Sequence, residues 1–331
     1  MPADSRCVLT LAVGAPLYLD CAVNLARSFR WWHRTSATRF AIATDAPDRL
    51  PADLREWVEV VPLDRTCCGV GFRAKLYLDQ LAPADRTLFV DADCLCVGNL
   101  ESVFDRFARH AVGVVGGTIA EGEWFGNVAN ICEHFNVAAL PKFNGGVYYF
   151  ERGTTSSAVY EFARSLEKQY DELGLVRLRN QPNDELLLAI AMAVHRLAAI
   201  PDDGSILGDP QACPCNLSVN VLAGASRLVN PPPTNSHHQS WYPVGAIHPL
   251  LVHFLGHHVQ SSLYRREAIK LELTVARHWP ASLAQAAAAV YTAPAQMSNL
   301  ARQVLRPAYH RLFGPRRIAS DGRYVESTGS H

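Results

Sequence analysis

A strand–helix–strand unit near the start of the chain is the feature that most restricts what the chain can fold into. Residues 8–13 are apolar, as is typical of a buried β-strand, and Gly14 and Pro16 interrupt them. Residues 18–32 repeat apolar side chains at helical spacing, and residues 40–44 form a second short apolar run. Two strands joined by a helix are the usual way to build a parallel sheet, so we predict an α/β fold.

Further apolar runs continue this alternation of strands and helices. We expect strands at residues 57–61, 88–97, 112–115, 147–150 and 250–256, and helices at residues 73–81, 100–109, 155–173 and 186–197. Residues 201–248 are rich in turn-forming residues, and we expect them to consist mainly of loops.

The length and charge of the chain favour one large domain with an extension. A chain of 331 residues exceeds the usual single-domain size, but α/β domains of about 200–250 residues are ordinary. We therefore expect one domain over residues 1–276 and an extension over residues 277–331. Lys+Arg and Asp+Glu number 31 each, so no overall basic field attracts nucleic acid, and we expect no nucleic-acid partner.

The cysteines and the apolar runs indicate where the protein works. Nine cysteines, an odd number, are scattered along a chain that is long enough to build a full core, which makes a disulfide framework a poor explanation. We expect free thiols and a cytoplasmic protein. No apolar run approaches the roughly 20 residues that a helix needs to span a bilayer.

Two carboxylates one residue apart lie within the apolar run at residues 88–97. In an extended chain Asp91 and Asp93 project to the same side, about 7 Å apart, while Ala92 faces the sheet. Oxygen ligands beyond the carboxyl end of a strand in an α/β sheet suit a hard cation such as Mg²⁺ or Mn²⁺. A solvated junction between a strand and a loop has the same pattern, because Asp is a common turn residue. The flanking segments must decide between the two.

Other polar residues stand at the ends of predicted elements. Lys75 lies near the start of a predicted helix, and Asp184 and Glu185 open another, where acids often only complement the helix dipole. The glycines after Asn144 permit close approach to a ligand, although their commonest use is a tight turn. His253 lies in the last predicted strand and is either a packed core residue or a metal ligand.

Taken in order, these segments resemble a known family. The motifs are residues 73–76 (Arg-Ala-Lys-Leu), 88–93, 143–147 (Phe-Asn-Gly-Gly-Val), 183–184 and 253–256 (His-Phe-Leu-Gly). Together they resemble a retaining glycosyltransferase of the GT-A fold, most like family 8, the glycogenin and lipopolysaccharide galactosyltransferase group. The resemblance covers residues 7–260. It implies a Rossmann-like, mixed and mostly parallel sheet flanked by helices, with a nucleotide-binding half at about residues 1–98 and an acceptor half at residues 99–260.

The resemblance also assigns roles to individual residues. It makes Asp91, Asp93 and His253 the ligands of a Mn²⁺ or Mg²⁺ ion that grips the diphosphate of a nucleotide-sugar, with a UDP-sugar favoured. It puts Asp184 and Asn183 beside the reacting carbon. The other donor-binding positions that it implies are Tyr18, Lys75, Ala92, Asn144, Gly145, Gly146 and Gly256.

This sequence departs from the family pattern at three places. Ala15 or Pro16 stands where an acidic residue usually helps to read uracil, so the nucleobase stays open. Val259 replaces a lysine that pairs with phosphate, and the Asp-Gln pair expected at the sugar site reads Pro-Asn-Asp over residues 182–184. The candidates for a replacement cation are His257, His258 and Arg265.

The predicted function is transfer of a sugar from a nucleotide-sugar to an acceptor hydroxyl with retention, and three alternatives remain. An inverting GT-A enzyme would use Asp184 or Glu185 as general base. A haloacid-dehalogenase-type phosphohydrolase also places Asp-x-Asp after a strand, but it requires Thr or Val where this chain has Leu95. A non-catalytic nucleotide-sugar-binding protein is the third.

The C-terminal extension is locally basic. Residues 273–320 contain no Asp or Glu, and they carry Arg277, Arg302, Arg306, Arg311, Arg316 and Arg317. Apolar residues at helical spacing accompany them, namely Leu300, Val304, Leu305, Tyr309 and Leu312, although Pro307 must bend or interrupt such a helix. We expect residues 297–317 to contact anionic lipid at the inner membrane face, or to pack on the catalytic domain. The acceptor is then a glycan, a lipid-linked glycan or a small molecule.

Overall fold

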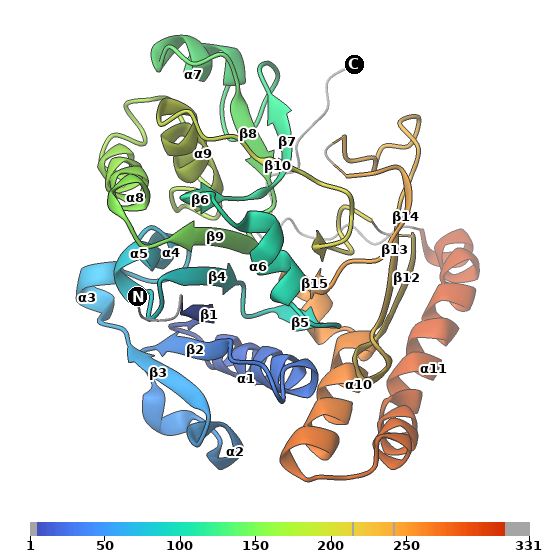
Figure 1. Cartoon of the computed structure of the whole chain (residues 1–331). Coiled ribbons are helices and arrows are strands. Elements are labelled where there is room, and N and C mark those ends of the chain that lie inside the picture. The colour runs from blue at the N-terminus through green and yellow to red at the C-terminus, as the bar shows by residue number, and fades with distance from the viewer. Residues whose placement is uncertain (1–4, 214, 241, 315–331) are drawn as a thin grey trace.

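A six-stranded sheet forms the centre of the computed structural model, which describes residues 5–213, 215–240 and 242–314 (Figure 1). Three of the five strand pairs in this sheet are parallel, and the two pairs that involve β9 are antiparallel. The predicted mixed, mostly parallel α/β fold is therefore confirmed. The order across the sheet is β3 (Val58–Pro62), β2 (Arg39–Thr44), β1 (Arg6–Ala12), β4 (Arg86–Val90), β9 (Val147–Glu151) and β6 (Val112–Gly113).

Helices cover both faces of this sheet, because its strands are apolar on both sides. Val8 of β1 packs in one core with Phe29 of α1 (Pro16–Trp32). Its neighbours Cys7 and Leu9 point the other way and pack with helices α8 (Thr154–Glu167) and α9 (Asp184–Val194). The sheet is therefore the middle layer of three, as in other α/β domains.

The predicted strand over residues 88–97 is wrong, because the chain turns at the two aspartates. β4 ends at Val90, and β5 (Cys94–Cys96) belongs to a separate three-stranded sheet of order β11-β15-β5. The backbone N–H of Cys94 donates to the carbonyl of Asp91 at 3.0 Å and closes the turn. The apolar residues after the turn form β5, which pairs in antiparallel orientation with β15 (Leu251–His253). Their backbone groups therefore find partners without continuing β4.

Residues 201–248 contain more regular structure than we expected. They include an antiparallel sheet of β12 (Cys215–Asn220), β13 (Ala225–Asn230) and β14 (Gly245–Ile247). Gly224, at a φ of 67°, makes the left-handed turn between the first two of these strands. Two further short strands in this part of the chain are β10 (Ile200–Pro201) and β11 (Leu207–Gly208).

Several other predicted elements exist with changed bounds. The strand predicted at residues 112–115 divides, and its second part becomes β7 (Val115–Ile119), which pairs with β8 (Leu140–Phe143). The helix predicted at residues 73–81 is two single turns, α4 (Phe72–Lys75) and α5 (Leu78–Leu81). The remaining elements are η1 (Pro47–Arg49), α2 (Ala52–Arg55), α3 (Arg65–Cys68), α6 (Glu101–Phe107), α7 (Val128–His134), η2 (Val221–Ala223), η3 (Gly256–Gln260) and η4 (Glu272–Ala276).

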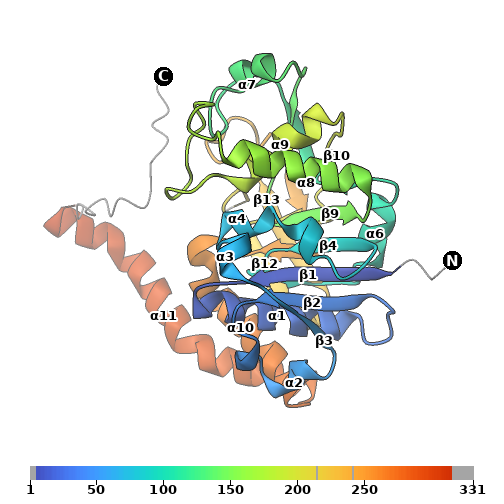
Figure 2. The ribbon, with the colours of Figure 1, turned by 90° about the vertical axis from the view of Figure 1, so that its left-hand side faces the viewer.

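Two helices follow the last strand. α11 (Ala281–Phe313) packs against α10 (Ser262–Leu271) through Ala284, Ala288 and Thr292, which are all buried. Beyond these residues α11 extends away from the sheet, as Figure 2 shows. Pro307 does not end the helix. Within the described part of the chain, no helix is both long enough and apolar enough to cross a membrane.

Candidate active site

A cavity of about 230 Å³ lies where β1 and β4 end, between the turn before β9 and the start of α9. Parallel neighbours end at the same edge of a sheet, which is where open α/β folds bind ligands. Most of the residues predicted for the site line this cavity: Tyr18, Lys75, Asp91, Ala92, Asp93, Asn144, Asn183, Asp184, His253 and Gly256. Gly145 and Gly146 stand next to it, in the turn that leads into β9.

Asp91, Asp93 and His253 come together at the floor of the cavity. His253 Nε2 lies 3.0 Å from Asp93 Oδ1 and 3.6 Å from Asp91 Oδ2. Among the residues that the structure describes, the compact group of metal-ligating atoms consists of Asp93, Cys94 and His253, within 4.8 Å of one another. Burial raises the pKa of the Cys94 thiol well above its ordinary value, and Asp93 adds to the effect, so the thiol keeps its proton.

Lys75 is paired with two acids of the site. Its Nζ donates to Asp91 Oδ2 at 2.8 Å and to the Gly145 carbonyl at 3.0 Å, and it lies 3.6 Å from Asp184 Oδ2. Burial opposes the charge of Lys75, but Asp184 and Asp91 outweigh burial and raise its pKa, so the ammonium stays charged.

The charges around His253 favour a cation at the site. Burial alone would lower the pKa of His253, but the neighbouring Asp93 and Asp91 carboxylates raise it to about 9. Burial would raise the pKa of Asp93, and the charge and hydrogen bond of His253 instead lower it. Four acids line the cavity, because Asp184 and Glu185 join the two aspartates, and they outnumber the three bases Lys75, Arg179 and His253. An excess of carboxylates suits a divalent cation.

The two residues predicted beside the reacting carbon are held by other contacts. Asn183 is 1% exposed, and its Oδ1 caps α9 by accepting the N–H of Leu186 at 2.9 Å. Asp184 is 2% exposed, and its Oδ2 accepts the hydroxyl hydrogen of Tyr148 at 2.5 Å. Both side chains border the cavity, but each already has a structural partner.

Glu185 is less deeply buried than Asp184 and lines the same wall. Its Oε1 accepts the backbone N–H of Gly145 at 2.7 Å, which ties α9 to the glycine turn. Burial raises the pKa of Glu185 to about 7, and the adjacent Asp184 carboxylate adds to this shift. Glu185 therefore gains or loses a proton near neutral pH, as a general base must.

A second cavity, of about 550 Å³, opens beside the first. The two share Tyr18, Asp93, Arg179 and Gly256, so they form one cleft that passes over Asp93. Tyr18 is 44% exposed at the start of α1, where an aromatic ring is available to stack on a ligand. Val259, which departs from the family pattern, and His257, a candidate for the replacement cation, line this second cavity.

Arg179 is a site residue that the sequence analysis missed. Residues 178–181 make a tight turn in which the N–H groups of Leu178 and Gln181 donate to each other's carbonyl groups, at 2.9 and 3.0 Å. Arg179 and Asn180 occupy the centre at φ values of 52° and 62°, as in a type I′ turn. Asn tolerates this conformation, whereas Arg rarely adopts it, so a pattern of residue types does not predict Arg179 at the cleft.

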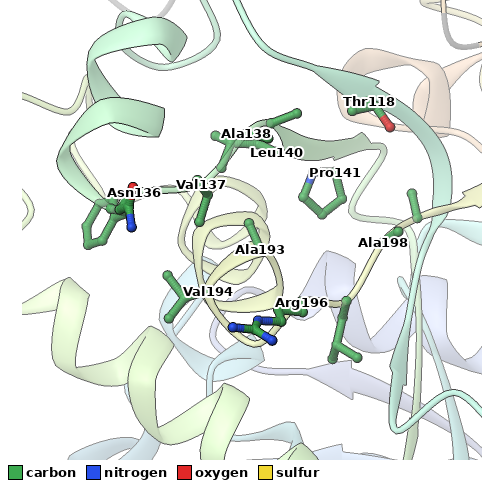
Figure 3. Close-up of a pocket in the computed structure, with 14 residues that line it drawn as sticks. Thr118, Asn136, Val137, Ala138, Leu140, Pro141, Ala193, Val194, Arg196 and Ala198 are labelled. Atoms are coloured by element: carbon green, nitrogen blue, oxygen red, sulfur yellow. The ribbon is translucent and has the colours of Figure 1, made fainter.

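Another cavity, of about 490 Å³, lies between β8 and the end of α9, away from the carboxylates (Figure 3). Small and apolar side chains such as Val137, Pro141 and Ala193 form most of its wall, and Arg196 lies at one side. None of its 14 lining residues, all in the described part of the chain, is Asp, Glu, His or Cys. It offers no metal ligand and no general base.

No family model matches the sequence, and no curated protein is similar to it in sequence. Solved structures are similar in fold. The galactosyltransferase LgtC, in complex with donor and acceptor sugar analogs, is 14% identical with a TM-score of 0.48, over 76% of this chain and 87% of that chain. Mouse xyloside xylosyltransferase 1 is 15% identical with a TM-score of 0.42, over 63% and 88%. The glycosyltransferase GlyE of Streptococcus pneumoniae is 13% identical with a TM-score of 0.40, over 59% and 45%. All three are glycosyltransferases.

Proposed function

We propose that this protein is a metal-dependent glycosyltransferase that moves a sugar from a nucleotide-sugar, with a UDP-sugar favoured, to an acceptor hydroxyl. The observation that carries the proposal is the convergence of Asp91, Asp93 and His253 at one end of a cleft that also contains the half-buried Lys75. Carboxylate oxygens and one imidazole nitrogen suit Mn²⁺ or Mg²⁺.

The residues fit a divalent ion in charge as well as in donor type. Asp93 and His253 would hold the ion, with Asp91 beside them. When bound, such an ion acts as a Lewis acid and stabilises the negative charge of the departing nucleoside diphosphate. Arg179, on the rim of both cavities, supplies a positive side chain near the phosphates in the place of the lysine that Val259 replaces.

Retention is the proposed stereochemical outcome. In that front-side route the acceptor hydroxyl attacks on the face of the leaving group, and no carboxylate nucleophile is required. The contacts of Asp184 with Tyr148 and Lys75 agree with this route, because they use the carboxylate for structure. The inverting alternative has one observation in its favour, namely Glu185, whose raised pKa of about 7 suits a general base. The anomeric configuration of the product distinguishes the two.

We also propose that the protein acts in the cytoplasm on the inner membrane face, where a lipid-linked glycan would be its acceptor. The alternative that α11 packs on the catalytic domain disagrees with the exposure of its second half in the described residues, where Met297, Val304, Leu305 and Leu312 are 63–78% exposed. Arg302, Arg306 and Arg311 lie among them and suit anionic headgroups. The side chain of Leu300, and Arg316 and Arg317, lie outside the described residues.

The experiment that tests the proposal is a thermal-shift screen of nucleotide-sugars with and without Mn²⁺. A ligand that binds only the folded protein raises its melting temperature by mass action. We expect a UDP-sugar to raise the melting temperature only when Mn²⁺ is present, and sugar transfer or donor hydrolysis to follow the same requirement. A nucleotide-sugar that stabilises the protein without ever being turned over would instead support the non-catalytic alternative.

A further inference from the structure

The small sheet β11-β15-β5 brings an unassigned carboxylate next to the metal-binding histidine. β11 and β15 are parallel, and Gly208 pairs with Val252, so the residues that follow them, Asp209 and His253, are neighbours. Asp209 is 3% exposed and lines neither cavity of the cleft. Burying a carboxylate costs free energy unless hydrogen-bond donors surround it.

Four donors surround the Asp209 carboxylate. The backbone N–H groups of Gln211 and Ala212 donate to Oδ1 at 3.0 and 2.7 Å. The Tyr242 hydroxyl and the side-chain amide of Asn144 donate to Oδ2 at 3.1 and 3.0 Å. With its charge held by these donors, Asp209 accepts hydrogen bonds and cannot donate one.

Two independent contacts fix which way the Asn144 amide faces. Its Nδ2 must point to Asp209, because the carboxylate only accepts. Its Oδ1 accepts the backbone N–H of Gly146 at 2.9 Å, which requires the same orientation. The amide oxygen therefore faces Nδ1 of His253, 2.9 Å away.

The orientation of Asn144 decides where His253 keeps a proton. Nδ1 must carry hydrogen, because it faces an oxygen that only accepts. Nε2 lies 3.0 Å from the Asp93 carboxylate and donates to it when no metal is bound. A metal ion would take the place of that Nε2 hydrogen, and the contact with Asn144 would keep the other hydrogen on Nδ1. Partners that fix the tautomer of a ligating histidine commonly matter for metal affinity.

We propose that Asp209 is a positioning residue that sets the ring tautomer of His253 through Asn144. This relay runs from the Tyr242 hydroxyl through Asp209 and Asn144 to His253, and every hydrogen bond in it has a defined direction. The inference rests on the proposed metal-binding function. It adds a residue that touches neither metal nor substrate.

Replacing Asp209 with Asn breaks the direction of the relay while keeping its volume. The oxygen of the new amide still suits the N–H groups of Gln211 and Ala212, which leaves its NH₂ group facing the NH₂ group of Asn144. Either two donors oppose each other, or Asn144 rotates and presents NH₂ to His253. The double substitution Asn144→Asp with Asp209→Asn restores an acceptor at position 144 and a donor at position 209.

The test is Mn²⁺ affinity, measured by electron paramagnetic resonance, for the wild type, the two single variants and the double variant. We expect the Asp209→Asn and Asn144→Asp variants to bind Mn²⁺ about 10- to 100-fold more weakly, and the double variant to recover most of the loss. The surface variant Asp203→Asn is the matched control and should bind like the wild type. Wild-type affinity in Asp209→Asn, or a double variant as weak as that single variant, would overturn the relay.

A second readout separates the relay from the proposed function. Long-range ¹⁵N–¹H spectra of the metal-free proteins report whether Nδ1 of His253 carries a hydrogen-bonded hydrogen. The relay predicts this hydrogen on Nδ1 in the wild type and its loss, or the loss of its hydrogen bond, in Asp209→Asn. If the wild type fails to bind Mn²⁺, the metal-binding function is wrong and these spectra still decide the relay. The same Nδ1 signal in both proteins would reject it.

Discussion

Lys75 shows how a single side chain compensates two like charges in one site. Its ammonium lies 2.8 Å from Asp91 and 3.6 Å from Asp184, and 5.4 and 5.7 Å from the ring centres of Phe89 and Tyr148. The sequence resemblance predicted a basic group near the donor phosphates. The structure adds that Lys75 also compensates the charges of Asp91 and the buried Asp184, so its removal should affect both binding and stability.

We therefore expect Lys75→Ala to weaken the binding of a nucleoside diphosphate by about 1.5 to 3 kcal/mol, the range for a hydrogen bond to a charged group. Calorimetric titration of UDP with Mn²⁺ present measures this difference. Lys168→Ala, an exposed position at the end of α8, serves as the control. Equal affinity in the Lys75→Ala variant and the wild type would assign Lys75 to the structure alone.

Glu185 makes the stability of the fold depend on pH. Burial raises its pKa from 4.5 to about 7, so the stability that this group contributes is complete below pH 4.5 and is lost as the pH rises through 7. Gln imitates the protonated acid at every pH. We expect Glu185→Gln to gain about 2 kcal/mol relative to the wild type between pH 5 and pH 8.

Chemical denaturation of both proteins at the two pH values measures that gain. The exposed Glu172→Gln should show a difference from the wild type that does not change with pH. A constant difference for Glu185→Gln would mean that the carboxyl titrates as an ordinary surface acid.

At the scale of elements, the sequence predicted the parallel sheet and its helices but not where strands change partners. The apolar run around Asp91 and Asp93 has the same composition whether it is one strand or two joined by a turn. The pairing of its second part, β5, with β15, which is distant in the chain, decides between them.

The strand β13 was not predicted because its buried face is partly polar. It carries Ser226 and Asn230, whose side chains donate hydrogen bonds to backbone carbonyls, so the usual alternation of apolar and polar residues is absent.

The site was predictable to the extent that it stands at strand ends. Asp91, Asp93 and His253 follow or close apolar runs, which is a local signal. Arg179 and Asp209 have no such signal. Arg179 lies at the cleft because of a left-handed backbone conformation that Arg seldom adopts. Asp209 lies beside His253 because of the register between β11 and β15.

The turn at residues 178–181 provides a test of Arg179. Glycine adopts positive φ without strain, so Arg179→Gly should keep the turn and change the free energy of unfolding by less than about 1 kcal/mol. It should raise the KM for the donor several-fold, because a cation at the cleft is lost. Asn180→Gly keeps the cation in the same turn and is the matched control. An unchanged KM for the donor in Arg179→Gly would show that Arg179 does not bind the phosphates.

At the scale of the whole molecule, positive charge gathers near the C-terminal end of the chain. The chain has equal numbers of acidic and basic residues, yet residues 273–320 contain no acid. Its last helix packs on α10 through its first turns only and then exposes apolar and basic side chains together. The proposed role of this end of the molecule is contact with an anionic membrane surface.

Sedimentation with vesicles that contain anionic lipid tests this contact. The full chain should pellet at low salt and be released at high salt, because each basic residue near the surface contributes about 1 kcal/mol and salt screens it. A chain that ends at Ala293 keeps the buried contacts of α11 and should stay in the supernatant. If the full chain ignores the vesicles, the exposed helix has another partner.

The most direct test of the central claim is donor turnover by Asp93→Asn. Asn keeps the volume of Asp93 and removes a charged ligand, so hydrolysis or transfer from a panel of UDP-sugars with Mn²⁺ should fall by orders of magnitude while the melting temperature stays near that of the wild type. Asp203→Asn, which changes an exposed acid paired with Arg106, should turn over the donor at the wild-type rate. The account predicts that wild-type turnover also stops when Mn²⁺ and Mg²⁺ are chelated. Turnover in Asp93→Asn equal to that of the wild type would contradict it.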